Sequence, residues 1–324
     1  MMFRVGIIGA GWIAEQMAMS LAPLDDYCVY AIASRSGDKA RAFADKWKIA
    51  KAYNSYEQLV ADSNIDLVYI ATPHSHHFEH AMLAINSGKN VLVEKAFTAN
   101  ARQAEELIAK AERNGVFITE AIWTRYMPLS AKVKQLMDSG IIGEPRVLTA
   151  SLCYMMEYKE RIISPELCGG ALLDLGVYAL NFARMYFGTD IVKTVSNCIL
   201  SNKGMDMHEC ISLTFRNGRM ANLQAGALCL NDRQGIISGT EGYIRVDNIN
   251  CPEQIDVVRN YKLIATIKRP DDMITGYEYQ VRECRRCIEA GLKESPLMPH
   301  TETISIMQQM DTMRSEWGVH YPMD

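Results

Sequence analysis

Three side chains of the types that move protons stand out in this 324-residue sequence: Lys95, Asp174 and Tyr178. Lys95 follows residues 90–94, whose apolar centre 91–93 predicts a strand, and an open parallel sheet binds its ligands at the carboxyl ends of its strands. Asp174 and Tyr178 are spaced as i and i+4 within a predicted helix over 170–187, so they share one of its faces. They are either catalytic or a helix-face pair that hydrogen-bonds within the fold.

The chemistry open to these three side chains is proton transfer coupled to oxidation of an alcohol. A phenol with its ordinary pKa of about 10 is a poor base at neutral pH, but a nearby ammonium lowers that pKa. Tyr178 could therefore take the hydroxyl proton, with Lys95 as its electrostatic helper. Asp174 could orient the hydroxyl group or the lysine.

A glycine-rich segment near the N-terminus predicts a phosphate-binding loop. The strand-like run 3–8 leads into Gly9 and Gly11, and Ala14 follows at the start of a helical pattern. Gly9 permits a tight turn, Gly11 lets backbone N–H groups approach a pyrophosphate, and Ala14 lets the helix lie close to the strand. With a second strand over 29–33, this makes a βαβ dinucleotide site. The cofactor contacts expected here are Gly9, Gly11, Trp12 and Ile13.

The residues after the second strand discriminate between the two nicotinamide coenzymes. An acidic residue there would accept a hydrogen bond from the ribose 2′-OH of NAD, whereas this chain has Ser34, Arg35 and, further on, Lys39. A guanidinium and an ammonium suit a 2′-phosphate, so the pattern favours NADP, with NAD as the alternative. The alternative is that Arg35 and Lys39 bind no cofactor and are ordinary solvated charges at the start of a helix.

Composition bounds the remaining functions. The chain is 48% hydrophobic and 22% charged, has a net charge of −4 and a pI near 6.0, and shows no basic stripe. We expect a cytoplasmic protein with a small-molecule ligand and no nucleic-acid partner. We expect no membrane partner either, because no apolar run approaches the roughly 18 residues that cross a bilayer and no signal-peptide pattern appears.

The cysteines and histidines are expected to bind no metal. Nine cysteines, an odd number, suit reduced thiols, and the close pair Cys284 and Cys287 has no second pair to complete a zinc site. The histidines between 74 and 80 have His-x-x-His spacing, yet they follow a predicted strand end, where they would line a nicotinamide cleft. The cofactor contacts expected around the strand ends are Thr72, Pro73, His77, Glu94 and Lys95.

The periodicity predicts an α/β protein of two domains. Apolar strands alternate with amphipathic helices over 1–121, which indicates a Rossmann domain with a doubly wound parallel sheet. Over 122–324 one long helix precedes several strand-like runs, which indicates an α+β domain with a large, mostly antiparallel open sheet. Two helices close the chain, the last of which could pack back toward the first domain. We expect the active site in the crevice between the domains.

Together these motifs resemble the Gfo/Idh/MocA oxidoreductase family over essentially the whole chain. The segments that carry the resemblance are 9–14, 71–73 with His77, Glu94-Lys95, 169–176, 239–242 and 295–299. In that family the lysine and the helix aspartate lie beside the nicotinamide, and a histidine usually follows the aspartate by four positions. Tyr178 at that position, with 120–125, is similar to the branch of dimeric dihydrodiol dehydrogenases and NADP-linked D-xylose dehydrogenases.

The resemblance implies an NADP-dependent oxidoreductase acting on a sugar or cyclic diol, with Tyr178 as acid/base and a homodimer formed through the C-terminal sheet. It also implies that Trp123 walls the substrate pocket. The other candidate substrate contacts are Arg125, Tyr154 and Arg161. Two departures are visible: Ala96 stands where the family motif has proline, and His74 where asparagine is common. An NAD-linked sugar or inositol dehydrogenase and a non-catalytic dinucleotide sensor remain the alternatives.

Overall fold

The computed structural model describes residues 2–324, which form two compact units. The first unit contains residues 2–123, Ile274–Gln308 and Met323. The second contains Thr124–Met273, Gln309–Pro322 and Asp324. Residues 274–308 thus lie with the first unit, whereas the sequence predicts a second domain over 122–324 whose last helix could pack back toward the first domain.

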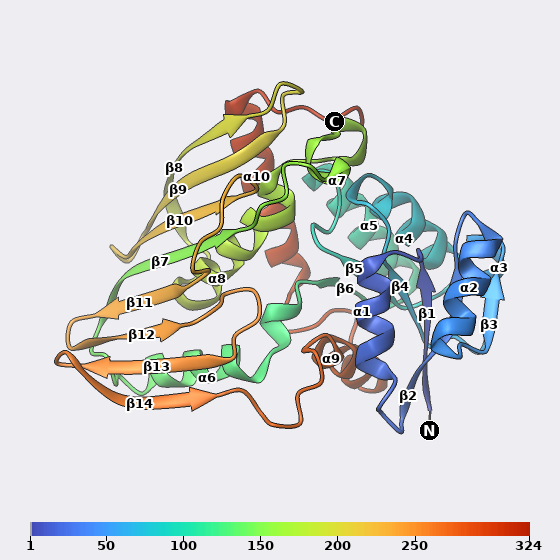
Figure 1. The fold of residues 1–324 in the computed structure, drawn as a ribbon, viewed down its shortest axis with the longest axis horizontal. Helices are drawn as coiled ribbons and strands as arrows, with labels where there is room; N and C mark the ends of the chain where they lie inside the picture. The colour runs from blue at the N-terminus through green and yellow to red at the C-terminus, as the bar shows by residue number, and fades with distance from the viewer. Residues whose placement is uncertain (1) are drawn as a thin grey trace. The chain divides into compact units, whose positions relative to one another are not determined.

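The first unit is built on a parallel sheet with the strand order β3-β2-β1-β4-β5-β6 (Figure 1). The strands are β1 (Phe3–Ile8), β2 (Tyr27–Ala33), β3 (Lys51–Tyr53), β4 (Leu67–Ile70), β5 (Val91–Glu94) and β6 (Ile118–Ala121). The direction of winding reverses between β1 and β4, which is the switch point where such sheets bind ligands. The predicted Rossmann sheet is confirmed, and only the short β3 was not anticipated.

The helices of this unit include three with a side-chain cap at the N-terminus. The helices are α1 (Trp12–Leu21), α2 (Gly37–Trp47), α3 (Tyr56–Val60), α4 (His77–Asn86) after the 3₁₀ turn η1 (His74–His76), α5 (Ala101–Asn114) and α9 (Glu278–Glu289). Ser36, Ser55 and Asn100 cap α2, α3 and α5 by accepting from a backbone N–H of the first turn.

Helix α9 explains why the first unit extends beyond the N-terminal part of the chain. Its residues Val281, Cys284 and Cys287 are buried in one hydrophobic core with Val5 and Met17. The helical pattern of the sequence predicts two closing helices, and in α9, the first of them, the buried residues form an apolar face. The pattern carries no information about which surface will cover that face.

The second unit is built on a mixed sheet with the order β14-β13-β12-β11-β7-β10-β9-β8 (Figure 1). The strands are β7 (Pro145–Cys153), β8 (Ile191–Leu200), β9 (Asp206–Phe215), β10 (Met220–Gly226), β11 (Gly235–Gly239), β12 (Gly242–Val246), β13 (Gln254–Arg259) and β14 (Lys262–Lys268). All neighbouring strands are antiparallel except β7 and β10. The predicted mostly antiparallel sheet is confirmed, but the sequence reading missed the internal strand β7.

The helices of the second unit cover one face of this sheet. They are α6 (Pro128–Asp138), α7 (Glu160–Ile163), the 3₁₀ turn η3 (Pro165–Leu167), the π-turn η4 (Leu172–Gly176) and α8 (Val177–Phe187); η2 (Trp123–Tyr126) and α10 (His300–Trp317) contribute to both units. Along β9, Glu209 and Ile211 are buried, whereas His208 is half-buried and Cys210 is exposed. Alternate residues thus point to a covered face and an open face.

Candidate active site

The loop between β1 and α1 has the form that a bound pyrophosphate requires. Gly9 has φ +106°, and a Cβ atom there would lie 2.6 Å from the carbonyl oxygen of Ala71, so the position needs glycine. Gly11 caps α1 with open space above it, and no side chain caps the first turn. The backbone N–H groups at the positive end of α1 are therefore left open to an anion. Trp12 is 67% exposed beside them, and Ile13 is half-buried.

Two unpaired positive charges follow β2. Arg35 and Lys39 are exposed, and neither charged group makes an ion pair or hydrogen bond with any residue between 2 and 324. Their neighbour Arg41, by contrast, pairs with Asp38 and donates to Asn54. Ser34 is buried, and its hydroxyl accepts from the backbone N–H of Ser36 at 3.4 Å. The loop therefore offers its charge to an external anion.

A ring pair that the sequence did not reveal lies near Arg35. The rings of Tyr56 and His80 meet edge to face with centroids 4.5 Å apart, and His80 Nδ1 lies 3.0 Å from Thr72 Oγ1. Burial, with the nearby charge of Arg35 as a smaller cause, lowers the pKa of His80 to about 4. His80 is therefore neutral at neutral pH, and Arg35 remains the charged group of this cluster.

Lys95 extends from the end of β5 and is half-buried. The preceding Glu94 is buried and accepts hydrogen bonds from the hydroxyl of Tyr69 and, at 3.3 Å, from the backbone N–H of Lys95. The peptide bond between Lys95 and Ala96 is cis. Glu94 thus anchors the segment that carries the lysine.

His77 braces the ends of two neighbouring strands. Its Nδ1 lies 2.8 Å from the carbonyl oxygen of Ala96, and its Nε2 lies 2.7 Å from that of Thr72. Burial lowers the pKa of His77 to about 4, although both carbonyl groups oppose this shift. The side chain is fully buried, so the structure gives His77 a positioning role next to Thr72 and Lys95 rather than an exposed ligand contact.

Asp174 and Tyr178 lie where a π-turn meets an α-helix. The sequence predicts one continuous helix from 170, but residues 172–176 form the π-turn η4 and α8 begins at Val177. Such turns occur frequently at functional sites. Both residues are almost fully buried, with exposed fractions of 4% for Asp174 and 6% for Tyr178.

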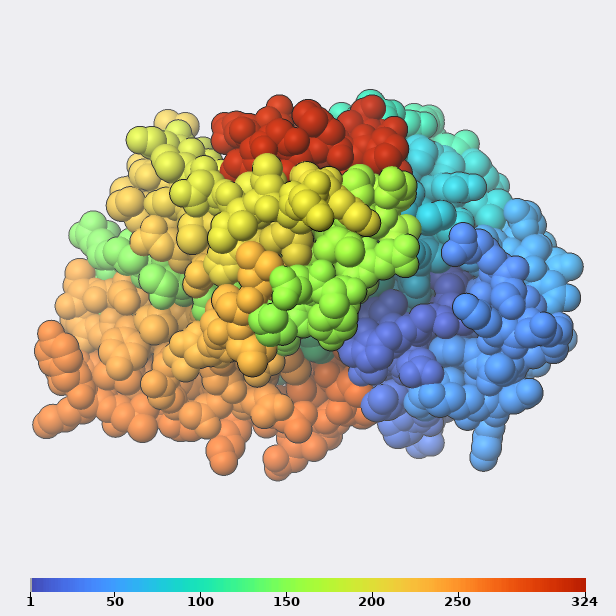
Figure 2. Space-filling model, turned by 45° about the horizontal axis from the view of Figure 1, so that its top comes forward, coloured from blue at the N-terminus to red at the C-terminus, as the bar shows by residue number. Residues whose placement is uncertain are grey.

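Arg161, a predicted substrate contact, forms an ion pair with Asp174. Arg161 comes from α7, on the segment that is yellow-green in Figure 2 and lies at the surface of its unit. Its side chain is 45% exposed, whereas that of Asp174 is 6% exposed. The arginine thus neutralises a buried carboxylate and fixes its direction.

Strand β9 holds the backbone ahead of Asp174. Asp206 accepts from the backbone N–H of Leu172 at 2.6 Å, and a Cβ atom at Gly170 would clash with its carboxylate. Burial raises the pKa of Asp206 to about 6, against the opposing hydrogen bond from Leu172. Glu209 lies beneath the other end of the π-turn, where a Cβ atom at Gly176 would be 2.6 Å from its Oε1.

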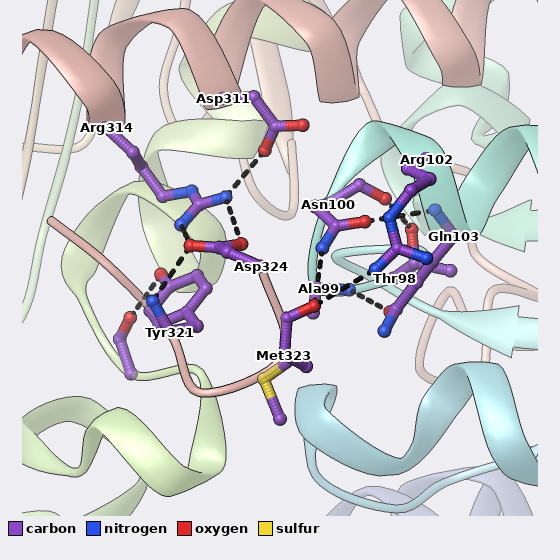
Figure 3. A network of polar contacts seen from close by, with 11 residues as sticks. Thr98, Ala99, Asn100, Arg102, Gln103, Asp311, Arg314, Tyr321, Met323 and Asp324 are labelled. Carbon is purple, nitrogen blue, oxygen red and sulfur yellow. Dashed lines mark hydrogen bonds and ion pairs between the residues drawn. The ribbon is translucent and has the colours of Figure 1, made fainter.

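The end of the chain braces the same turn (Figure 3). The hydroxyl of Tyr321 donates to the carbonyl oxygen of Gly169 at 2.6 Å, and the guanidinium of Arg314 lies 4.2 Å from the centroid of the Tyr321 ring. Arg314 donates to Asp311 at 2.7 Å and to both carboxylate oxygens of Asp324 at 3.0 and 3.1 Å. Within the first unit, the carbonyl oxygen of Met323 accepts from Asn100 and Arg102, each at 3.2 Å.

The other predicted substrate contacts have protein partners of their own. The Trp123 ring stacks on that of Tyr277 with centroids 4.0 Å apart. Arg125 donates to Asn181 at 2.6 Å, which places its guanidinium against α8 one turn beyond Tyr178. Tyr154 lies under the guanidinium of Arg233 and accepts from it at 3.3 Å.

Comparison with known proteins identifies the family. Residues 3–121 match the oxidoreductase family with an NAD-binding Rossmann fold, and residues 130–245 match the GFO/IDH/MocA C-terminal domain. A trans-1,2-dihydrobenzene-1,2-diol dehydrogenase from Danio rerio is 33% identical to this chain, and the alignment covers 100% of this chain and 99% of that protein. The chain belongs to the Gfo/Idh/MocA family of oxidoreductases. It is an NAD(P)-dependent dehydrogenase.

Further Gfo/Idh/MocA relatives agree in sequence and in fold. The dihydrodiol dehydrogenase of Xenopus tropicalis is 34% identical, with 98% of both chains covered. The 3-ketoreductase KijD10 from Actinomadura kijaniata, crystallised with NADP and TDP-benzene, superposes with a TM-score of 0.87 at 25% identity, covering 97% of this chain and 98% of that one. Between residues 2 and 324, no helix of this family member is both long and apolar enough to cross a membrane.

Proposed function

We propose that this dehydrogenase uses NADP(H) to move a hydride to or from a secondary alcohol or hemiacetal carbon of a sugar or cyclic diol. The observation that carries the coenzyme preference is the pair of unpaired cations, Arg35 and Lys39, at the end of β2 with no carboxylate at the strand tip. The names of the relatives support the substrate class, since they include diol dehydrogenases and a ketoreductase crystallised with NADP.

The proposed roles follow from the chemistry of each side chain. When bound, the coenzyme supplies or accepts the hydride. The phenolate form of Tyr178 takes the proton of the substrate hydroxyl during oxidation, and the phenol form returns it during reduction. Lys95 lowers the pKa of that phenol, so the proposal requires its ammonium to lie beside Tyr178 in the working enzyme. Asp174, fixed by Arg161, orients the substrate hydroxyl.

The remaining predicted contacts surround these groups in the proposal. Trp123, Arg125 and Tyr154 contribute to the substrate pocket. Backbone N–H groups at Gly11 and the first turn of α1 hold the pyrophosphate. We further propose a cytoplasmic homodimer formed through the open face of the β7–β14 sheet. Light scattering at micromolar concentration tests the dimer, and a monomer would count against it.

Replacing Arg35 tests the coenzyme preference. Arg35→Asp removes a charged partner of the 2′-phosphate, an interaction of about 1.5–3 kcal/mol, so the Kd for NADP⁺ should rise roughly 10- to 150-fold. The Kd for NAD⁺ should change only a few-fold. Titration of both coenzymes by fluorescence measures this, with Arg41→Ala as the control because Arg41 already pairs with Asp38. Equal weakening of the two coenzymes would contradict the assignment.

A substrate panel tests the reaction itself. We expect NADP⁺-dependent turnover of at least one aldose or trans-cyclic diol, followed by the absorbance of NADPH. Turnover with NAD⁺ alone would favour an NAD-linked sugar or inositol dehydrogenase. Tight coenzyme binding without turnover of any sugar or diol would instead favour a dinucleotide sensor.

A further inference from the structure

Three side chains with soft donor atoms converge at one end of the second unit's sheet. The Cys153 and Cys229 Sγ atoms and a ring nitrogen of His208 all lie within 4.8 Å of one another. Cys153 ends β7, His208 lies on β9, and Cys229 follows β10. None of the three takes part in the proposed hydride-transfer chemistry.

The strand register brings Cys153 and His208 to the same face. Gly226 on β10 is paired with Cys153 on one side and with His208 on the other. Side chains of paired residues project to the same side of a sheet, so both point to the open face with Gly226 between them. A Cβ atom at position 226 would lie 2.1 Å from His208 Nδ1. Only glycine there lets the imidazole lie over β10.

The second nitrogen of His208 has a partner of its own. His208 Nε2 lies 2.9 Å from the side-chain nitrogen of Gln224, on the same strand face. In metal sites the ligating histidine is held through its other ring nitrogen in this way, which fixes the orientation of the ring. Rotation of the Gln224 amide presents its oxygen to Nε2–H and leaves the Nδ1 lone pair for a cation.

The two cysteines are held close to each other by the surrounding backbone. The backbone N–H of Cys153 donates to Asn231 Oδ1 at 3.0 Å, which ties the loop that contains Cys229 to the end of β7. Cys153 is buried at the end of β7.

We propose that Cys153, His208 and Cys229 bind one divalent cation of the zinc class. Zinc takes thiolate and imidazole ligands in tetrahedral geometry at about 2.3 and 2.0–2.1 Å, so its ligand atoms are roughly 3.3–3.8 Å apart. The three donor atoms reach that spacing by small side-chain rotations. Zn²⁺ displaces one proton from each thiol, and water takes the fourth position. The bound ion clamps β7, β9 and the loop after β10 together.

Cobalt titration tests the proposal on the full-length protein. The protein is reduced, stripped with a chelator and titrated with Co²⁺, which gives a thiolate-to-cobalt charge-transfer band when cysteines ligate it. We expect the band to saturate at one ion per chain and to vanish when Zn²⁺ displaces Co²⁺. Cys229→Ser should abolish the band, and His208→Ala should weaken Co²⁺ binding at least tenfold.

Matched variants and a second readout keep the test decisive. Cys210→Ser and Cys198→Ser change thiols outside the cluster and should titrate like the wild type. Zn²⁺ should raise the Tm of the wild type but not of Cys229→Ser, since only a bound ligand shifts stability. The proposal is overturned by a wild type without the band, by Cys229→Ser binding equally well, or by a Cys153–Cys229 disulfide that re-forms after reduction while no cobalt binds.

Discussion

At the scale of single residues, the Asp174 side chain and the backbone that carries Lys95 are held by specific side chains. Asp174 is paired with Arg161, and the segment of Lys95 is anchored by Glu94 and braced by His77. The ion pair restricts the rotamers of Asp174, and the contacts of Glu94 and His77 restrict the backbone from which Lys95 extends. Fixed catalytic groups lower the entropic cost of reaching the transition state. Substitutions at this scale should therefore act on kcat more than on folding.

Replacing Tyr178 with Phe isolates the proposed proton carrier. The ring and its packing remain, but the hydroxyl is lost, so kcat should fall about 10²- to 10⁴-fold. Coenzyme Kd should stay within a few-fold, because the groups proposed to bind it lie around Gly11 and Arg35. Steady-state kinetics on an accepted sugar or diol measures the effect.

Tyr186 on the same helix provides the matched control. Its hydroxyl donates to the carbonyl oxygen of Ser130 at 3.3 Å, so Tyr186→Phe should lower Tm and leave kcat unchanged. Lys95→Met should move the pH–rate profile to higher pH, as the phenol loses its cationic neighbour. A Tyr178→Phe variant with lowered Tm and wild-type kcat would make Tyr178 a packing residue.

At the scale of elements, the π-turn and the strand beneath it form one unit. Asp206 and Glu209 of β9 lie under Leu172 and Gly176, the two ends of η4. The Glu209 carboxyl is fully buried and has no hydrogen-bond partner among residues 2–324. Burial, with Asp206 as a second cause, raises the pKa of Glu209 well above its ordinary value.

This shift predicts how stability depends on pH. Below the unfolded-state pKa, near 4.5, Glu209 is protonated in both states and costs nothing. As pH rises toward the higher folded-state pKa, only the unfolded state ionises, and stability falls by about 1.4 kcal/mol per pH unit. Glu209→Gln cannot ionise, so in a series from pH 4.5 to pH 8 its Tm relative to wild type should increase until the pH reaches the folded-state pKa of Glu209.

Thermal unfolding across that pH range measures the difference. The exposed Glu157 is the control, and Glu157→Gln should follow the wild-type profile at every pH. The comparison uses the change of the difference with pH, because the buried amide introduced by Glu209→Gln adds a cost that does not vary with pH. A difference that stays constant would show that Glu209 is ionised in the folded protein.

At the scale of the whole molecule, the last residues of the chain support a turn far away in the sequence. Arg314 is only 3% exposed and keeps its charge through Asp311 and Asp324. It also packs on Tyr321, which holds Gly169 just before the π-turn. The C-terminus therefore stabilises the backbone that leads into the candidate catalytic helix.

Removing the Asp324 side chain should destabilise the protein. Asp324→Ala leaves buried donors of Arg314 without acceptors, which costs about 1–3 kcal/mol of the free energy of unfolding. Urea unfolding measures it, and Glu316→Ala, an exposed change on the same helix α10, should stay within about 0.5 kcal/mol of wild type. A stability for Asp324→Ala equal to that of the control would mean that the chain end does not stabilise the fold.

The sequence by itself determined the elements, the family and the candidate residues. These features depend on signals that act over a few positions, and such signals can be recognised without a structure. They are strand and helix periodicity, the glycines of the loop after β1 and the N-cap residues. The parallel Rossmann sheet and the mostly antiparallel second sheet followed from these local signals. The loop around Arg35 could be predicted as a coenzyme contact for the same reason, because it directly follows a predicted strand.

The tertiary structure decided what packs against what. Four features depend on contacts between distant segments. They are the placement of α9, the strand β7 that the sequence analysis missed, the π-turn before α8 and the Arg161–Asp174 ion pair. The cluster of Cys153, His208 and Cys229 shows the reason most clearly. Its members belong to three separate segments, and only the pairing of β7, β10 and β9 around Gly226 makes them neighbours. The register between strands depends on which face of the whole sheet is buried, so it cannot be predicted from the local sequence of one strand.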